Sequence, residues 1–160
     1  MVNSITINPV GVINATEEAF SITIDNEYLP ALTALNGFSH IQVVWWGNLL
    51  ASPDHRKQLT SVKPYKTGPE SIGVFATRSP FRPNPILITT VYVQEINFKK
   101  GTIVTPYIDA EDKTPVLDIK PYHPCERIRD VAVPGWCSHW PKWDEDAMTF
   151  DWQAEFNFPG

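Results

Sequence analysis

The stretch Gly73 to Pro85, which reads Gly-Val-Phe-Ala-Thr-Arg-Ser-Pro-Phe-Arg-Pro-Asn-Pro, concentrates polar groups that suit ligand binding. Proline fixes its own φ angle and holds the preceding residue extended, so the three prolines stiffen this backbone. Arg78, Arg82 and Asn84 therefore project from a rigid loop at little entropic cost. A loop that only connects two strands would use Gly, Asn, Asp or a single Pro. The pattern predicts a preorganised binding loop.

A second polar element, Thr114 to Tyr122, reads Thr-Pro-Val-Leu-Asp-Ile-Lys-Pro-Tyr. Asp118 and Lys120 alternate with apolar residues, so in an extended segment both charges share one face while the apolar pair enters the core. The two could act together on a ligand. The alternative is an ordinary ion pair on a strand, or neutralisation of Arg82 by Asp118, and the residue types alone favour that structural interpretation.

Length and charge narrow the function classes. A chain of 160 residues with 42% apolar content is one domain's worth and can bury a sizeable core. Its net charge of -5 lacks the basic excess typical of nucleic-acid-binding proteins. Lysines and arginines nevertheless recur from Arg56 to Arg129, whereas the last segment is acidic. A local basic face therefore remains an alternative to an ordinary solvated surface.

Targeting signals and metal ligands are sparse in the sequence. The start carries no basic and apolar leader, and no apolar run is long enough to cross a bilayer, which predicts a cytoplasmic protein. Cys125 and Cys137 are accordingly expected to be reduced thiols rather than a disulfide. Together with His139 they follow no recognised zinc spacing, so we expect no metal site.

Short β-branched and aromatic runs dominate the chain, whereas proline is abundant and helical periodicity is scarce. One short helix is predicted around Tyr28, Leu32 and Leu35, with Asn36-Gly37 as its stop. Lys99 to Gly101 is predicted as a hairpin turn. Strands are predicted at 4–7, 10–13, 20–24, 41–46, 72–76, 86–95 and 102–108.

The close spacing of these strands predicts a mainly β, single-domain fold, an antiparallel sheet closed into a barrel-like form with few short helices. The continuous apolar run 41–46 is expected to be buried on both faces. Residues 47–69 show no period and are predicted to form a long loop, which in a compact domain tends to be functional or mobile. The aromatic, acidic segment 124–160 is expected to pack on the core formed by residues 5–123, as irregular structure or short helices.

Four motifs, in order along the chain, resemble those of one family. They are Val10-Gly-Val-Ile13, Gly37-Phe-Ser-His40, the Gly73 to Pro85 loop and Thr114 to Tyr122. The chain is similar to the TsaA-like domain family, whose characterised bacterial members are TrmO-type tRNA methyltransferases. The likeness spans roughly residues 9 to 123, and a chance match of Ala-Thr-Arg-Ser-Pro-Phe-Arg-Pro-Asn-Pro is not credible.

The resemblance implies an S-adenosylmethionine-binding domain that forms homodimers, with the cofactor near the subunit interface. It also implies a methyl acceptor, the exocyclic nitrogen of the threonylcarbamoyl-modified adenosine beside the anticodon of a tRNA. Carried over by position, the residues expected at the cofactor are Gly47, Asn48, Phe75, Thr77, Arg78, Arg82, Asn84, Pro85, Lys113, Thr114, Pro115, Val116 and Lys120.

Methyl transfer from a sulfonium is an in-line displacement, so positioning and exclusion of water matter more than a dedicated nucleophile. Arg78 or Arg82 would bind the cofactor's carboxylate, and Phe75 with backbone groups would hold its adenine and ribose. A weak base near the acceptor would take the departing proton. Asp118 and Tyr122 are the candidate catalytic residues for that step.

Several features depart from the family pattern. The stretch from 13 to 36 is shorter than in the longer bacterial members and lacks their Arg-Gln-Pro-type loop. Leu87 stands where the family usually has glycine, and Gly47-Asn48 stands where it usually has an aromatic-His pair. An acidic, Trp-rich tail replaces their C-terminal extension. These departures concern ligand or tRNA contacts, so the resemblance supports the fold more directly than the acceptor.

Two rival functions follow from the same residues. One is a non-catalytic module that binds S-adenosylmethionine or another nucleotide-like ligand in the same cleft. The other is a methyltransferase that acts on a small molecule, because an acidic tail is a poor partner for an anticodon stem. If tRNA is the substrate, the candidate phosphate contacts are Arg56, Lys57, Lys63 and Lys66.

Overall fold

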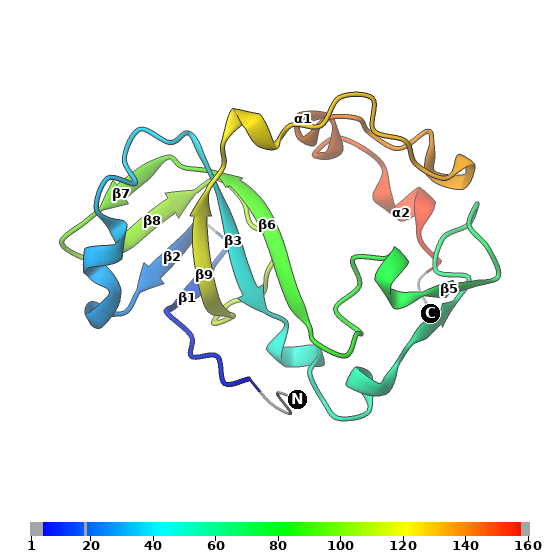
Figure 1. The fold of residues 1–160 in the computed structure, drawn as a ribbon, viewed down its shortest axis with the longest axis horizontal. Coiled ribbons are helices and arrows are strands. Elements are labelled where there is room, and N and C mark those ends of the chain that lie inside the picture. Colours follow the sequence, from blue (N-terminus) through cyan, green and yellow to red (C-terminus); the bar gives the residue numbers. More distant parts are fainter. Residues whose placement is uncertain (1–4, 18, 158–160) are drawn as a thin grey trace.

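The computed structural model describes residues 5–17 and 19–157 and is built around a seven-stranded antiparallel sheet (Figure 1). The strand order is β6-β3-β9-β1-β2-β8-β7, and every neighbouring pair is antiparallel. The strands are β1 Gly11–Ala15, β2 Phe20–Ile24, β3 His40–Trp46, β6 Ile86–Tyr92, β7 Glu95–Asn97, β8 Thr102–Thr105 and β9 Pro115–Pro121.

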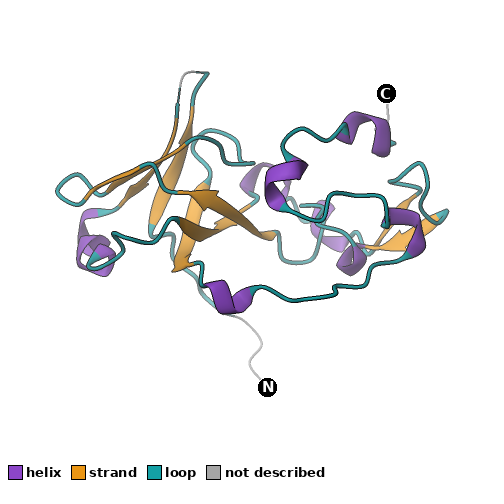
Figure 2. Ribbon diagram, turned by 90° about the horizontal axis from the view of Figure 1, so that it is seen from above, coloured by secondary structure: helices purple, strands orange, loops and turns teal. Residues whose placement is uncertain are grey.

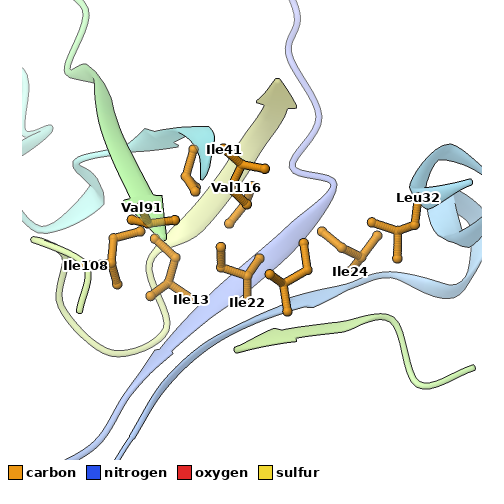
Figure 3. Packing of buried hydrophobic residues seen from close by; sticks show 10 residues of the cluster. Ile13, Ile22, Ile24, Leu32, Ile41, Val91, Ile108 and Val116 are labelled. Carbon is orange, nitrogen blue, oxygen red and sulfur yellow. The ribbon is translucent and has the colours of Figure 1, made fainter. Parts of the chain in front are cut away.

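The hydrophobic core lies on one face of this sheet. Ile13, Ile22 and Ile41, from three different strands, are fully buried and point into the same apolar cluster (Figure 3). In β3 burial alternates, with Ile41 and Val43 fully buried between half-buried neighbours. The expectation that this strand is buried on both faces is therefore wrong, because an antiparallel sheet can pack one face on the core and leave the other open.

The sheet is not closed into a barrel. The edge strands β6 and β7 are both fully described and do not pair with each other, although only Val93 and Gln94 separate them in the chain. The Val93 N–H donates to the Ser39 carbonyl oxygen at 2.8 Å, and the Gln94 N–H to that of Val104 at 2.9 Å. The chain thus crosses from one edge to the other, and the edges meet only at this crossing. The mainly β antiparallel class is confirmed, whereas closure is wrong.

A short hairpin and several 3₁₀ turns occupy the region between β3 and β6. This region was expected to be a loop followed by a strand at 72–76, but β5 ends at Gly73 and a turn follows it. The elements are η2 Asn48–Leu50, η3 His55–Lys57, β4 Thr60–Val62, β5 Ser71–Gly73 and η4 Val74–Ala76.

The C-terminal aromatic segment packs on this hairpin rather than over the seven-stranded sheet (Figure 2). Tyr65 stacks on Trp136 with ring centroids 5.1 Å apart, and it also contacts Trp140 and Phe156. The Lys66 N–H donates to the Glu155 carbonyl oxygen at 2.9 Å. The short helices of this segment are η5 Pro124–Glu126, η6 Gly135–Cys137, α1 Asp144–Ala147 and α2 Trp152–Glu155.

The remaining local predictions had mixed outcomes. The predicted helix is a 3₁₀ helix, η1 Asn26–Leu32, which contains Pro30. The hairpin turn before β8 is confirmed, with Gly101 at φ +66°. The predicted strand at 4–7 begins outside the described residues, and residues 5–7 form no strand. No helix of the described residues is long and apolar enough to cross a membrane.

Candidate functional site

Most of the predicted cofactor residues come from segments that meet at one end of the sheet, whereas Lys120 pairs opposite Gln42, toward the other end of β3. β3 ends at Trp46, opposite the first residue of β6, while Trp45 pairs with Val116 near the start of β9. The residues that follow β3 and those that precede β6 and β9 are therefore neighbours. A hydrogen bond of 2.8 Å from the Gly47 N–H to the Pro85 carbonyl oxygen joins two of these segments directly.

The Gly73 to Pro85 loop is held together by its own side chains. The guanidinium of Arg82 donates to the carbonyl oxygens of Val74, Thr77 and Ser79 at 3.2–3.4 Å. The Thr77 hydroxyl donates to the Val74 carbonyl oxygen at 2.9 Å and accepts from the Ser79 N–H. Arg82 and Thr77 therefore brace the loop, and at least two of the five N–H donors of Arg82 are used inside it rather than on a ligand carboxylate.

Arg78 and Phe75 lie on the outside of the loop. Arg78 Nη2 donates to the Ile88 carbonyl oxygen at 2.6 Å, which covers a backbone acceptor of the edge strand β6. Phe75, in η4, exposes 82% of its surface. An aromatic ring held in solvent by a braced backbone is suited to stack on a flat ligand.

A turn outside the loop supports it from the other side. The His55 ring meets the Phe81 ring edge to face at 4.8 Å, and its Nδ1 is buried without a hydrogen-bond partner in the described chain. The neighbouring Arg56 donates from Nε to the Pro83 carbonyl oxygen at 2.7 Å. Neither contact was predicted, because residues 47–69 carry no periodic signal and only tertiary packing shows what this turn touches.

The two departures Leu87 and Gly47 meet in space. A Cβ placed on Gly47 would lie 3.2 Å from Leu87 Cδ1, and 3.5 Å from the Cβ atoms of Pro80 and Pro85. The Leu87 side chain thus fills the space beside Gly47, and a large residue at 47 would collide with it. Leu87, Pro80 and Pro85 therefore pack around Gly47 at the base of the loop.

The segment Lys113 to Val116 runs beside β1, and part of it is buried. Thr114 is only 2% exposed, and its carbonyl oxygen accepts from the Ile13 N–H at 2.8 Å, while Val116 is fully buried. Lys113 adopts a left-handed backbone, φ +60°, and its ammonium lies at the surface, 2.7 Å from Asn14 Oδ1. Lys113 and the half-buried Pro115 are the members of this set that remain open to a ligand.

Asp118 and Lys120 share one face of β9, as predicted. Lys120 Nζ lies 2.7 Å from Asp118 Oδ2, and this hydrogen bond, with the attraction of the two charges, raises the pKa of Lys120. Both side chains are at least half exposed. Asp118 pairs opposite Val44, two residues before Trp46, the end of β3 that carries the site.

Tyr122 lies at the opposite end of β3. Its N–H donates to the carbonyl oxygen of His40, the first residue of that strand. Six residue steps along a strand span about 20 Å. Within one chain the structure therefore does not bring Tyr122 to the end that carries Gly47 and Pro85.

Two surface cavities lie away from this end of the sheet. They have volumes of about 370 and 320 Å³ and flank Gln94 where the sheet edges meet, and the first is lined by Phe20 and Thr105 and the second by Phe38 and Phe98. Neither includes any predicted cofactor residue. Among residues 5–17 and 19–157 no group of three His, Cys, Asp or Glu side chains could hold a metal ion.

Residues 6–126 match the family model described as the tRNA-methyltransferase O N-terminal domain. The chain belongs to the TrmO family. This match contains all four motifs and ends at Glu126, the last residue of η5, so all but the first three residues of the aromatic C-terminal segment lie outside the TrmO match.

Curated relatives of this TrmO-family chain have two kinds of name. An S-adenosyl-L-methionine-binding protein of Archaeoglobus fulgidus is 38% identical over 103 residues, covering 64% of this chain and 68% of the relative. The tRNA (adenine(37)-N6)-methyltransferase of Escherichia coli is 36% identical over 107 residues, covering 64% of this chain and 44% of that enzyme. The chain thus spans less than half the length of that enzyme.

Solved structures confirm the TrmO fold. The crystal structure of TrmO from Pseudomonas aeruginosa superposes with a TM-score of 0.62 at 24% identity, over 82% of this chain and 62% of that one. At this level of identity the likeness concerns the fold alone.

Proposed function

We propose that this protein is an S-adenosylmethionine-dependent methyltransferase that modifies N6 of an adenosine in tRNA, the threonylcarbamoyl-modified adenosine beside the anticodon. The observation that carries the proposal is the intact Gly73 to Pro85 loop, braced by Arg82 and set at the end of β3. Family membership supports the reaction class, and the names of the relatives support the cofactor.

The exposed groups at this end of the sheet suit the parts of the cofactor. The Phe75 ring would stack on the adenine, and the Lys113 ammonium or Arg78 would bind the carboxylate. Thr77, Arg82, Pro85, Thr114 and Val116 would act through the backbone they hold in place. In-line methyl transfer needs no covalent intermediate, so the protein's main tasks are to orient the sulfonium and the acceptor nitrogen.

Asp118 is the proposed base for the proton that leaves the acceptor nitrogen. Its carboxylate is half exposed and lies on the strand beside β3, where a water molecule can link it to the acceptor. Lys120 Nζ lies 2.7 Å from this carboxylate and would hold it in place. Tyr122 could reach the same reaction only from a second copy of the chain, because it lies at the other end of β3.

A homodimer would complete an otherwise open site. Ile86 and Ile88 on the edge strand β6 expose 37% and 45% of their surface beside the loop, an apolar surface that a second copy would cover. Light scattering coupled to size-exclusion chromatography tests this, with twice the 18.1 kDa chain mass expected.

The test of the function is transfer of a labelled methyl group. Purified protein is incubated with labelled S-adenosylmethionine and with tRNA from a strain that lacks this methyltransferase activity. After nuclease digestion, the label should be in the N6-methylated form of the threonylcarbamoyl-modified adenosine. Asp118→Asn should slow transfer by about 100-fold and leave cofactor affinity within about twofold. Full activity in Asp118→Asn would remove Asp118 from the mechanism without affecting the function.

A second candidate is a binding module without transferase activity. The archaeal relatives named only for S-adenosyl-L-methionine binding, and the net charge of -5, favour it. Saturable cofactor binding with no label in tRNA, at low and at physiological salt, would support this candidate and contradict transfer to tRNA. If the label appears in a small molecule instead of tRNA, the protein is a small-molecule methyltransferase.

A further inference from the structure

The guanidinium of Arg56 joins three parts of the chain at the binding loop. Its Nε donates to the Pro83 carbonyl oxygen at 2.7 Å, and its Nη2 to Oδ1 of Asn84 at 3.3 Å. The same group lies over the Trp46 ring, with Cζ 5.7 Å from the ring centroid. Arg56 therefore fastens the end of the loop to the end of β3.

The next residue provides a natural contrast. Lys57 carries the same charge, but its Nζ pairs with Asp54 Oδ1 at 3.1 Å within the same turn, and the two side chains are 76% and 90% exposed. Such a pair contributes little to stability. The hydrogen bond and ion pair described for Lys57 stay within its own turn, whereas those of Arg56 reach the loop, which makes Lys57 a matched control.

The contact with Arg56 decides how the Asn84 amide is oriented. A guanidinium has donors and no acceptor, so the amide oxygen of Asn84 must face Arg56 and its NH₂ group must face away. Asn84 therefore presents two N–H donors rather than an acceptor. S-adenosylmethionine offers matching acceptors in its carboxylate, its ribose oxygens and its adenine ring nitrogens.

We propose that Arg56 is a positioning residue for the cofactor. It acts through Asn84, whose amide it holds in the orientation that donates to an acceptor of S-adenosylmethionine. Its contact with the Pro83 carbonyl fixes the backbone from which Asn84 projects. This inference rests on the proposed function, because it assumes that the loop binds that cofactor. It gives Arg56 an internal role in place of the phosphate contact expected from sequence.

Calorimetric titration with S-adenosylmethionine tests the role. Arg56→Ala should raise Kd about tenfold, the loss expected when the Asn84 amide no longer donates to the cofactor, whereas Lys57→Ala should stay within about twofold. Arg56→Lys should restore binding only in part, because an ammonium can make one of the two bonds but not the planar pair. Thermal unfolding of each variant establishes that it is folded. An unchanged Kd in Arg56→Ala would overturn the proposal.

A double-mutant cycle separates positioning from general support of the fold. If Arg56 acts through Asn84, then Asn84→Ala should weaken binding about tenfold in the native protein and within about twofold in Arg56→Ala. Equal effects in both backgrounds would overturn the proposal. Asn84→Asp should also weaken binding, because its carboxylate still accepts from Arg56 but offers the cofactor no donor.

Failure of the underlying function gives a different result. If the native protein shows no saturable binding of S-adenosylmethionine, the proposed function and this inference fall together. If the native protein binds S-adenosylmethionine and the Arg56 and Asn84 variants bind it equally well, cofactor binding stands and the positioning role is wrong.

Discussion

Gly11, in the first motif, is a residue whose type is dictated by a neighbouring backbone. A Cβ at this position would collide with the carbonyl oxygen of Thr23 on β2, and β9 pairs with Gly11 on the other side. Rigid backbone on both sides prevents relief by a side-chain rotation. We expect Gly11→Ala to lower the free energy of unfolding by about 1–3 kcal/mol, measured by urea denaturation. A variant as stable as the native protein would show that β1 can shift.

Burial of the His55 Nδ1 atom lowers the stability of the fold. Its Nδ1 is buried and has no partner in the described chain, while its ring packs on Phe81. Leaving a buried polar group unpaired costs about 1–3 kcal/mol. His55→Phe keeps the aromatic contact and removes the polar atom, so it should raise the free energy of unfolding by about 1 kcal/mol in the same denaturation assay. Destabilisation would mean that Nδ1 is satisfied in solution.

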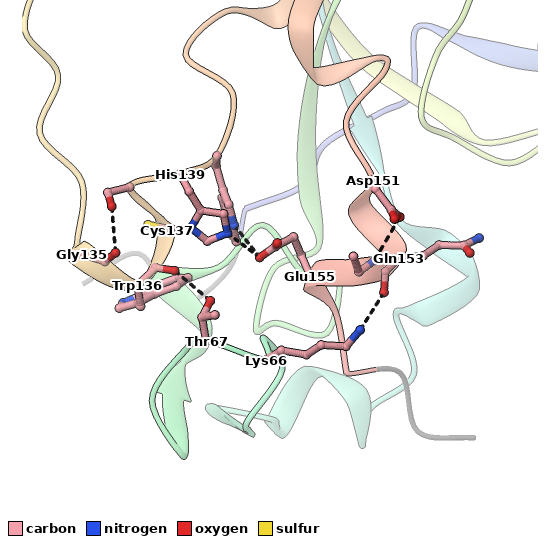
Figure 4. Close-up of polar contacts among 12 residues, drawn as sticks. Lys66, Thr67, Gly135, Trp136, Cys137, His139, Asp151, Gln153 and Glu155 are labelled. Carbon is pink, nitrogen blue, oxygen red and sulfur yellow. Dashed lines mark hydrogen bonds and ion pairs between the residues drawn. The ribbon is translucent and has the colours of Figure 1, made fainter.

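At the scale of elements, Glu155 of α2 fastens the C-terminal segment. Its carboxylate accepts from Trp140 Nε1 at 3.1 Å and lies 2.9 Å from His139 Nε2, while Lys66 donates to the Gln153 carbonyl oxygen (Figure 4). The Trp140 hydrogen bond, then the His139 and Lys66 charges, lower the pKa of Glu155 against the opposing effect of burial. The contacts of Glu155 with His139 and Trp140 also link α2 to the residues that follow η6.

This lowered pKa has a direction that can be measured. A carboxyl group with a depressed folded pKa stabilises the fold above its ordinary pKa of 4.5, and that contribution is lost as the pH falls through the folded value. Tryptophan emission from the aromatic cluster should therefore change as the pH falls below 4.5, and Glu155→Gln should abolish that part of the change. Glu145→Gln, at an exposed site on α1, should leave it intact.

At the scale of the whole molecule, local sequence patterns predicted the sheet better than its boundaries or its partners. The strand at 20–24 and the turn before β8 were confirmed because alternation and turn residues are local signals. Whether the sheet closes into a barrel could not be predicted from the sequence, because it depends on whether the edge strands β6 and β7 pair with each other. The sequence also could not show where the C-terminal segment packs. Aromatic residues indicate that the segment is buried, but they do not indicate which surface it packs against.

The site shows the same division between local and distant information. The rigid loop was visible in the residues Gly73 to Pro85 themselves, and the Asp118–Lys120 pair followed from their spacing. Arg56 and His55 were missed as supports because their contacts join positions far apart in the chain. The distance between Tyr122 and the end of β3 that carries Gly47 and Pro85 was also missed. It follows from the antiparallel pairing of β9 with β3, and the sequence does not show which strands pair.

The segment between η5 and η6 has a consequence for how the chain can be cut. Residues 127–134 are all exposed, including Ile128 at 79%, and the described backbone from 128 to 133 makes no hydrogen bond. Proteases prefer such segments. Brief trypsin treatment should cleave after Arg127 or Arg129 and give two bands on a denaturing gel that co-elute on a native sizing column. The aromatic cluster around Tyr65 would hold the nicked pieces together, so the protein could be reassembled from two separately made fragments.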